Sequence, residues 1–287
     1  MKVFKILILF SLTLFVFSCS NDNSVNPPIE YPQKAYANKR DVIATTPSNV
    51  KIYNGGFGSG IASNEEGVFY LMTDRGPNID GASDDEKIFS NPNFTPQIGK
   101  FKLVGDSLKI EKVIYLKDEN GSNLSGIPNP DDLGGTGEKP VDMQGKQIPY
   151  DVKGIDPEGL TIANDGTFWV SDEYGPHIIH FDANGRTLER INPFGNGPGG
   201  KKIPSVFKRR RPNRGMEGLA LTPDQKFLVG IMQSPLYNPD KSVKKTATAI
   251  RILFYEIATG SSKEYIYLLE SPNYAVSDIV ALSNSAF

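Results

Sequence analysis

The sequence predicts an all-β protein, a β-propeller with four-stranded blades and long loops. Three observations support this prediction: many turn residues, a tandem repeat of about 60 residues, and short apolar runs without helical periodicity. Gly and Pro contribute 28 and 21 of the 287 residues, which favours many turns over long helices. A large β-sandwich is the alternative fold that the same short strands would allow.

The N-terminus resembles the export signal of a bacterial lipoprotein. Two lysines precede the apolar run 6–17, which is too short and too early to serve well as a membrane-spanning helix. The single cysteine, Cys19, follows where lipoproteins carry the lipidated first residue of the mature chain. We therefore expect a signal peptide over 1–18, lipidation of Cys19, and a polar tether over 19–33. An ordinary signal peptide or an uncleaved anchor with an incidental cysteine is the alternative.

The remaining segment, 34–287, contains an internal repeat that organises the predicted domain. The apolar residues at the centre of its four first strands are Ile61, Leu160, Leu219 and Ile279. The last three lie about 60 residues apart, whereas the first interval is about 100 residues and must contain an insertion. The fourth copy begins at Ser277 and the chain ends at Phe287, so we expect a C-terminally incomplete propeller.

Each full copy is expected to form four short strands separated by turn residues. In the second copy the strands are predicted over 159–163, 167–172, 177–182 and 187–191. In the third copy they are predicted over 218–222, 226–233, 248–257 and 263–269. Continuous apolar runs such as Phe227–Met232 indicate strands covered on both faces, since a half-solvated strand would alternate.

The first strand of a propeller blade lines the central channel, so equivalent residues from successive copies converge there. The residues near the start of these strands are acidic in the last three copies, Glu158, Glu217 and Asp278, whereas the first copy has Ser59. Three converging carboxylates would repel one another unless a cation balanced them, and hard oxygen ligands suit Ca²⁺ better than zinc. We therefore predict a Ca²⁺ site formed by these three residues. Alternatively, each acid caps backbone amides at the entry of its blade.

The ends of the second strands carry another polar set that would point into the same channel mouth. The matching pairs are Asp74 and Arg75, Asp172 and Glu173, and Gln233 and Ser234. Asp172 or Glu173 is the candidate general base, and Arg75 is the candidate ligand of an anionic oxygen. His177 is a further catalytic candidate at this mouth. The alternative is that the Asp and Arg residues only stabilise a turn.

A strongly basic stretch, Lys208–Arg214, lies just before Glu217. Arginine suits phosphate binding, so we predict that Arg214 binds an anionic group at the channel mouth. A solvated loop and a contact with membrane phosphates are the two alternatives. The formal net charge of -2 gives no general attraction to nucleic acid, and no such partner is predicted.

Four short motifs follow one another in this chain: Thr73–Asn78, Asp156–Leu160, Ser171–Pro176 and Asn213–Leu219. Together they resemble the bacterial phytase-like family, described as having esterase-like activity of phytase. The resemblance extends from about residue 54 to the last residue and implies a secreted propeller that hydrolyses a phosphate or carboxylic ester. The site candidates that it implies are Glu158, Asp172, Glu173 and Glu217. A more distant likeness to paraoxonase and gluconolactonase propellers implies a central Ca²⁺ by fold analogy.

These observations predict a lipid-anchored protein of the bacterial cell envelope that hydrolyses a small-molecule ester or phosphoester with help from Ca²⁺. The metal would polarise the substrate and lower the pKa of a bound water. The rival prediction is a non-catalytic propeller that binds a partner or a glycan at the cell surface. With only two histidines in the chain, a Ser-His-Asp triad has little support.

Overall fold

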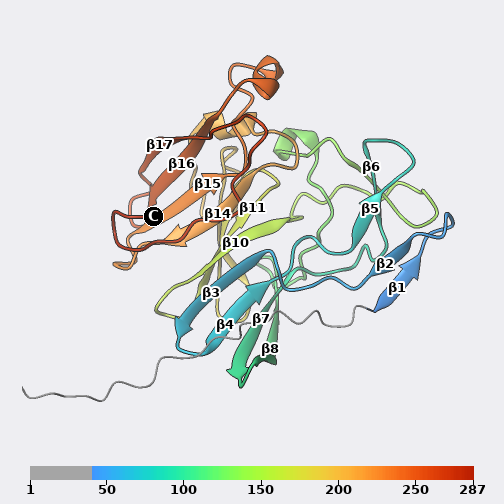
Figure 1. The fold of residues 1–287 in the computed structure, drawn as a ribbon, viewed down its shortest axis with the longest axis horizontal. Helices are drawn as coiled ribbons and strands as arrows, with labels where there is room; N and C mark the ends of the chain where they lie inside the picture. The colour runs from blue at the N-terminus through green and yellow to red at the C-terminus, as the bar shows by residue number, and fades with distance from the viewer. Residues whose placement is uncertain (1–40) are drawn as a thin grey trace, which may run out of the picture. The chain divides into compact units, whose positions relative to one another are not determined.

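Three four-stranded antiparallel sheets dominate the structure, a computed structural model that describes residues 41–287 (Figure 1). The first sheet consists of β3 (Gly60–Glu65), β4 (Val68–Met72), β7 (Gln97–Val104) and β8 (Ser107–Tyr115). The second consists of β10 (Pro157–Ile162), β11 (Phe168–Asp172), β12 (His177–Phe181) and β13 (Thr187–Ile191). The third consists of β14 (Met216–Leu221), β15 (Phe227–Met232), β16 (Ala249–Glu256) and β17 (Ser262–Leu268). The prediction of an all-β fold with four-stranded sheets is confirmed.

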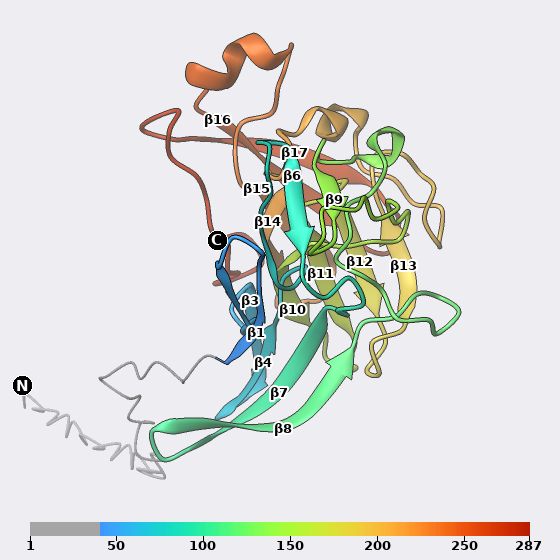
Figure 2. The same ribbon diagram turned by 90° about the vertical axis from the view of Figure 1, so that its right-hand side faces the viewer.

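The insertion expected in the first copy forms a smaller sheet of its own. It consists of β5 (Asn78–Asp80), β6 (Glu86–Phe89) and β9 (Lys139–Val141), and β6 pairs with β9 in parallel. Strands β6 and β9 are labelled in Figure 2. β1 (Val42–Thr45) and β2 (Lys51–Tyr53) pair with each other. The described residues contain no α-helix, only the 3₁₀-helices η1 (Asp131–Leu133), η2 (Ser205–Arg209) and η3 (Lys241–Lys245). No helix among residues 41–287 is long and apolar enough to cross a membrane.

The first strands of the three large sheets lie side by side, with β10 between β3 and β14 (Figure 1). A glycine at the same repeat position permits this approach in each case. A Cβ on Gly60 would lie 2.8 Å from the carbonyl oxygen of Glu158, and one on Gly159 would lie 2.5 Å from the backbone nitrogen of Leu219. Contacts this short exclude a side chain, so the glycines allow neighbouring sheets to meet at their first strands.

The segment of the fourth copy, 277–282, continues this arrangement without forming an assigned strand. A Cβ on Gly218 would lie 2.6 Å from the backbone nitrogen of Ile279, just as Gly159 meets Leu219. This register places Asp278 at the glycine position of the repeat, one residue beyond the position of the glutamates. Residues from all four first segments line one cavity of about 480 Å³, among them Ala62, Ile162, Leu221 and Val280.

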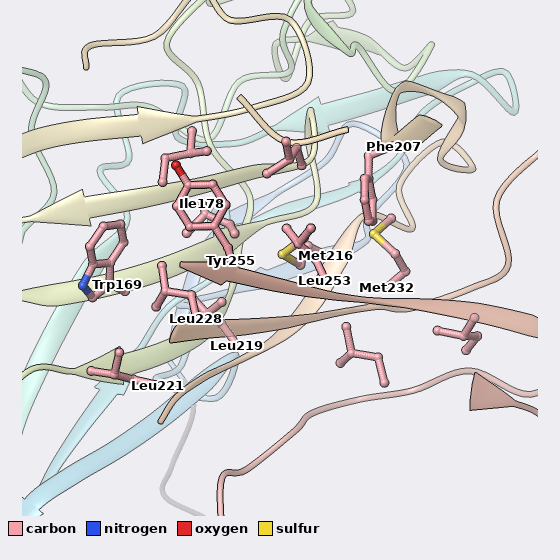
Figure 3. Close-up of a cluster of buried hydrophobic side chains, with 14 of the residues drawn as sticks. Trp169, Ile178, Phe207, Met216, Leu219, Leu221, Leu228, Met232, Leu253 and Tyr255 are labelled. Carbon is pink, nitrogen blue, oxygen red and sulfur yellow. The ribbon is translucent and has the colours of Figure 1, made fainter. Parts of the chain in front are cut away.

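The second sheet is covered on both faces, as its continuous apolar strands predicted. Phe168 and Val170 pack with residues of the first sheet, such as Met72 and Ile98. Trp169 belongs to the other cluster, which lies toward the third sheet (Figure 3). Successive side chains of a strand point to opposite faces, so a five-residue strand buried throughout serves two cores.

The hydrophobic cluster that contains Trp169 is drawn in Figure 3. Its other labelled members are Ile178, Phe207, Met216, Leu219, Leu221, Leu228, Met232, Leu253 and Tyr255. The predicted strands of the second and third copies agree with the observed ones to within one or two residues. The repeat therefore determines both the strands and the faces on which they pack, and it brings one end of each first strand to a common place.

Candidate functional site

Three carboxyl groups meet at the end of the second sheet where β10 begins and β11 ends. Asp156 directly precedes β10, Glu158 lies within it, and Glu173 directly follows β11. The antiparallel pairing of Pro157 with Asp172 brings these two strand ends together. One carboxylate oxygen from each acid lies within 4.8 Å of those of the other two. Asp156 and Glu173 are buried and Glu158 is half-buried, so we refer to these three residues as the acidic cluster.

Burial makes the charged forms of the acidic cluster unfavourable. It is the largest cause of a pKa of about 10 for Glu158 and of about 7 for Glu173. Burial also raises the pKa of Asp156 well above its usual range, although the charge of Arg75 opposes the effect. The neighbouring carboxylates add to each shift by mutual repulsion. A cation placed among the three groups would remove both penalties for ionisation.

Glu217, at the start of β14, lies beside the acidic cluster. Gln233 links them, because its Nε2 donates to Glu217 Oε2 at 2.6 Å and to Glu173 Oε1 at 3.0 Å. Burial is the main cause that raises the pKa of Glu217 to about 7. Burial also raises the pKa of Asp74, whose Oδ1 accepts a hydrogen bond from the backbone N–H of Gly76 at 2.8 Å. The site thus combines side chains from all three large sheets or from the loops that follow their strands.

Arg75 is the buried cation nearest to the acidic cluster. Its guanidinium is paired with Glu138, with Nη1–Oε2 at 2.7 Å and Nη2–Oε1 at 3.3 Å. Its Nε lies 3.5 Å from Asp156 Oδ2, and its backbone N–H donates to Asp156 Oδ1 at 3.2 Å. The same Nη1 also lies within hydrogen-bonding distance of the Tyr174 hydroxyl and of Asn213 Oδ1. With 6 % of its surface exposed, Arg75 positions Asp156 and partly balances its charge.

Asp172 is fully buried and holds together the backbone that carries the acidic cluster. Its Oδ1 accepts hydrogen bonds from the backbone N–H of Asp156 at 2.6 Å and of Tyr174 at 3.2 Å. Its Oδ2 is hydrogen-bonded to Nδ1 of His177 and lies 3.8 Å from Arg190 Nη2. These contacts make Asp172 a positioning residue for the segments on both sides of it.

His177 contacts Oδ2 of Asp172, whereas the backbone N–H of Asp156 binds Oδ1, and burial, aided by Arg190, lowers the pKa of His177 to about 4. It lines a separate cavity of about 340 Å³ together with Arg190, Lys153 and Asp118. None of the acidic-cluster residues lines that cavity. The structure therefore places His177 in a neighbouring pocket.

The remaining predicted site residues lie at the surface. Arg214 is exposed, donates from Nη1 to Ser234 Oγ at 3.3 Å, and is close enough to Glu217 to lower its pKa slightly against the effect of burial. Asp278 is also exposed and is not part of the acidic cluster. The signal peptide over 1–18, Cys19 and the tether over 19–33 lie outside the described residues.

Two residues of the site were not singled out from the sequence. Asp156 stands two residues before Glu158, and its position just ahead of the predicted strand is the feature of the sequence that could have identified it as a site residue. Glu138 lies in the insertion of the first copy, which has no equivalent elsewhere in the chain, so no repeat pattern could indicate that it pairs with Arg75.

The fold and the site define an all-β protein with repeated four-stranded sheets and a buried acidic cluster whose donor atoms can hold a metal ion. The chain belongs to the phytase-like family, described as "Esterase-like activity of phytase", whose family model matches residues 52–287.

Among curated relatives, an "Uncharacterized secreted protein" of Arthroderma benhamiae is 28% identical over 276 residues. The match covers 78% of this chain and 53% of the relative, so the chain spans about half the length of that protein.

Two solved structures share 11% sequence identity with this chain, each at a TM-score of 0.33. One is a protein from Lactobacillus plantarum, matched over 85% of this chain and 67% of that one. The other is the GH43 BlXynB protein from Bacillus licheniformis, matched over 76% of this chain and 30% of that one. Neither likeness is close enough to support an argument about this chain.

Proposed function

We propose that this protein is a Ca²⁺-assisted hydrolase of a phosphoester or carboxylic ester. The observation that carries the proposal is the acidic cluster, in which three largely buried carboxylates place oxygens within 4.8 Å of one another. Such an arrangement is costly in a folded protein unless a cation binds there. Membership of a family described by esterase-like activity supports hydrolysis as the chemistry.

The chemistry of the donor set fits a hard cation. All three groups are carboxylates from Asp156, Glu158 and Glu173, and oxygen-only ligation is typical of Ca²⁺ or Mg²⁺ rather than of zinc. A bound divalent cation would supply polarisation of the substrate and a lowered pKa for a coordinated water. In this proposal Asp156 and Glu173 take the places beside Glu158 that the sequence prediction assigned to Glu217 and Asp278.

The other residues of the site then have distinct roles. We assign the general base to Glu217, because it lies outside the acidic cluster but next to it and is partly accessible to solvent. Its carboxylate would accept a proton from the attacking water, and Gln233 would hold the carboxylates of Glu217 and Glu173 in register. Arg75 and Asp172 act through the positions of Asp156 and of the adjoining backbone.

For the fold, we propose that the three large sheets are consecutive blades of a β-propeller. The neighbouring first strands and the shared cavity lined by four first segments support this arrangement. The apolar residues exposed on β17, such as Tyr265 and Ile266, are consistent with a further blade against that side. An experimental structure tests it, and first strands that diverge from a common axis would contradict it.

For the location, we propose a lipid-anchored protein of the cell envelope. The charged start, the apolar run 6–17 and Cys19 support this, and a relative is named a secreted protein. Metabolic labelling with a radioactive fatty acid should mark the wild type but not the Cys19→Ser variant. Equal labelling of both proteins would contradict anchoring at this residue.

The hydrolase proposal is tested with purified full-length protein on phosphomonoesters, phosphodiesters and carboxylic esters, with Ca²⁺ or with a chelator. We expect chelator-sensitive turnover of one substrate class. Glu217→Gln should abolish it without unfolding the protein, whereas Glu66→Gln, a change at an exposed turn, should not. No turnover by protein that melts cooperatively would favour the rival function, a binding protein of the cell surface.

A further inference from the structure

A second charged region, of opposite sign, lies next to the proposed site. A cavity of about 430 Å³ is lined by four cationic side chains, Arg211, Arg214, Lys244 and Lys245. No Asp or Glu of the described chain lines it. Its walls come from the loop before β14, from the β15–β16 connection with η3, and from residues 272–274 after β17. We refer to it as the basic pocket.

Arg211 is the buried member of the basic pocket. Only 6 % of its surface is exposed, yet its Nε and Nη2 atoms have no hydrogen-bond partner. Its guanidinium carbon lies over the ring of Tyr237, 5.6 Å from the ring centroid, which places the cation against an aromatic face. A buried cationic donor without an acceptor is unfavourable, and Arg211 lines this cavity, so an acceptor reached by a small turn of the guanidinium toward the cavity would stabilise it.

The other three cations are exposed and are not neutralised within the described chain. Among residues 41–287, none of the four basic-pocket side chains forms an ion pair. Arg214 also lies next to Arg211, whose pKa its charge helps to lower. Four like charges around one cavity repel one another, and a multiply charged anion would reverse that repulsion.

We propose that the basic pocket binds the phosphate group of a small soluble phosphate ester. The planar fork of Arg211 suits two oxygens of a tetrahedral anion, and the two lysines add mobile point charges at the rim. A phosphate dianion gains more from four cations than a carboxylate does. The volume exceeds that of a phosphate alone, which leaves room for the organic part of the ester.

The test is calorimetric titration of inorganic phosphate and of glycerol phosphate into the full-length protein, in EDTA and at constant ionic strength. We expect saturable binding of both ligands. Arg211→Gln and the double variant Lys244→Gln/Lys245→Gln should each bind about tenfold more weakly or worse. Lys241→Gln, a matched change on η3 outside the pocket, should bind like the wild type.

No saturable binding, or equal weakening by Lys241→Gln, would overturn the proposal. If Arg211→Gln does not melt cooperatively, the double lysine variant decides, since both lysines are exposed. A parallel arm uses phosphatidylcholine vesicles with and without phosphatidic acid. Binding to the anionic vesicles without binding of glycerol phosphate would contradict a soluble ligand. EDTA keeps the acidic cluster free of metal, so this result is independent of the proposed hydrolysis.

Discussion

The acidic cluster and the basic pocket are two unbalanced charged regions that differ in how the protein holds them. In the acidic cluster the side chains are linked to the fold, with Asp156 held by Arg75 and Glu173 held by Gln233. In the basic pocket Arg211 contacts the ring of Tyr237, but no hydrogen bond satisfies its Nε and Nη2. The carboxylates have raised pKa values, which lets them take up protons in the absence of a cation.

This difference determines how each region lowers its electrostatic cost when no ion or ligand is bound. A carboxyl group lowers its cost by protonation near neutral pH, whereas an arginine keeps its charge. The acidic cluster should therefore couple strongly to pH and to metal, and the basic pocket to anions and to salt. Arg214 and Gly215 form the seam between them, since Gly215 packs against the backbone of Glu173.

The largest effect is expected from Glu217→Gln, which removes the proposed base but keeps the shape of the side chain. Turnover of the substrate found in the ester panel should fall about 100-fold or more, while the protein remains folded. Steady-state kinetics beside a thermal melt measures both. Undiminished turnover would remove Glu217 from the proposed mechanism.

The next effect concerns pH in the metal-free protein. Glu173 and Glu217 have a pKa of about 7 when folded and near 4.5 when unfolded, so the folded state retains protons that the unfolded state releases. The free energy of unfolding should therefore fall as pH rises from 4.5 to 7, by roughly a few kcal/mol for the two interacting groups together. His177 has a lowered pKa of about 4, so its own contribution makes the free energy of unfolding rise between pH 4 and 6.5. The two glutamates together have the larger effect.

Urea unfolding in EDTA at pH 5 and pH 8 measures this dependence. Added Ca²⁺ should restore stability at pH 8 because it replaces the lost protons among the carboxylates. A free energy of unfolding that is flat or rises over this range without metal would show that the carboxylates are not destabilised as described.

A smaller effect is expected from Gly215→Ala, at the seam between the two regions. A Cβ at this position would lie 2.2 Å from the carbonyl oxygen of Glu173, so the backbone must shift. We expect a loss of about 2 kcal/mol in the free energy of unfolding. Gly58→Ala is the matched control, since nothing lies within 4 Å of its Cβ position. Equal stability of the two variants would mean that the seam is not tightly packed.

The smallest effect is expected from Lys244→Gln/Lys245→Gln on stability. Both side chains are exposed and unpaired, so the free energy of unfolding should change by less than about 0.5 kcal/mol. The change should be a slight gain at low salt that disappears at high salt, because screening removes the repulsion with the arginines. Thermal melts at two salt concentrations measure it. A loss above about 1 kcal/mol would instead indicate a structural role for these lysines.

Much of the fold was predictable because a repeat reports on the same structure several times. It predicts the strands of the second and third copies, and it predicts that Glu158 and Glu217 lie close enough at one end for their charges to interact. Site residues outside the repeated pattern were not predicted. Glu138 lies in an insertion, and Asp156 lies in a loop that strand pairing brings into the site. Asp278 was aligned with Glu158 and Glu217 because all three residues are acidic. Its packing against Gly218 instead places it one position away from the glutamates in the repeat.

The measurement that tests the central claim most directly is Ca²⁺ binding by calorimetry to the chelator-treated full-length protein at pH 8. We predict saturable binding of one ion per chain to the wild type and to Glu66→Gln. Glu158→Gln removes one charge from the acidic cluster and should weaken binding at least about tenfold. No binding to the wild type, or the same affinity in Glu158→Gln, would contradict the assignment of the acidic cluster as a metal site.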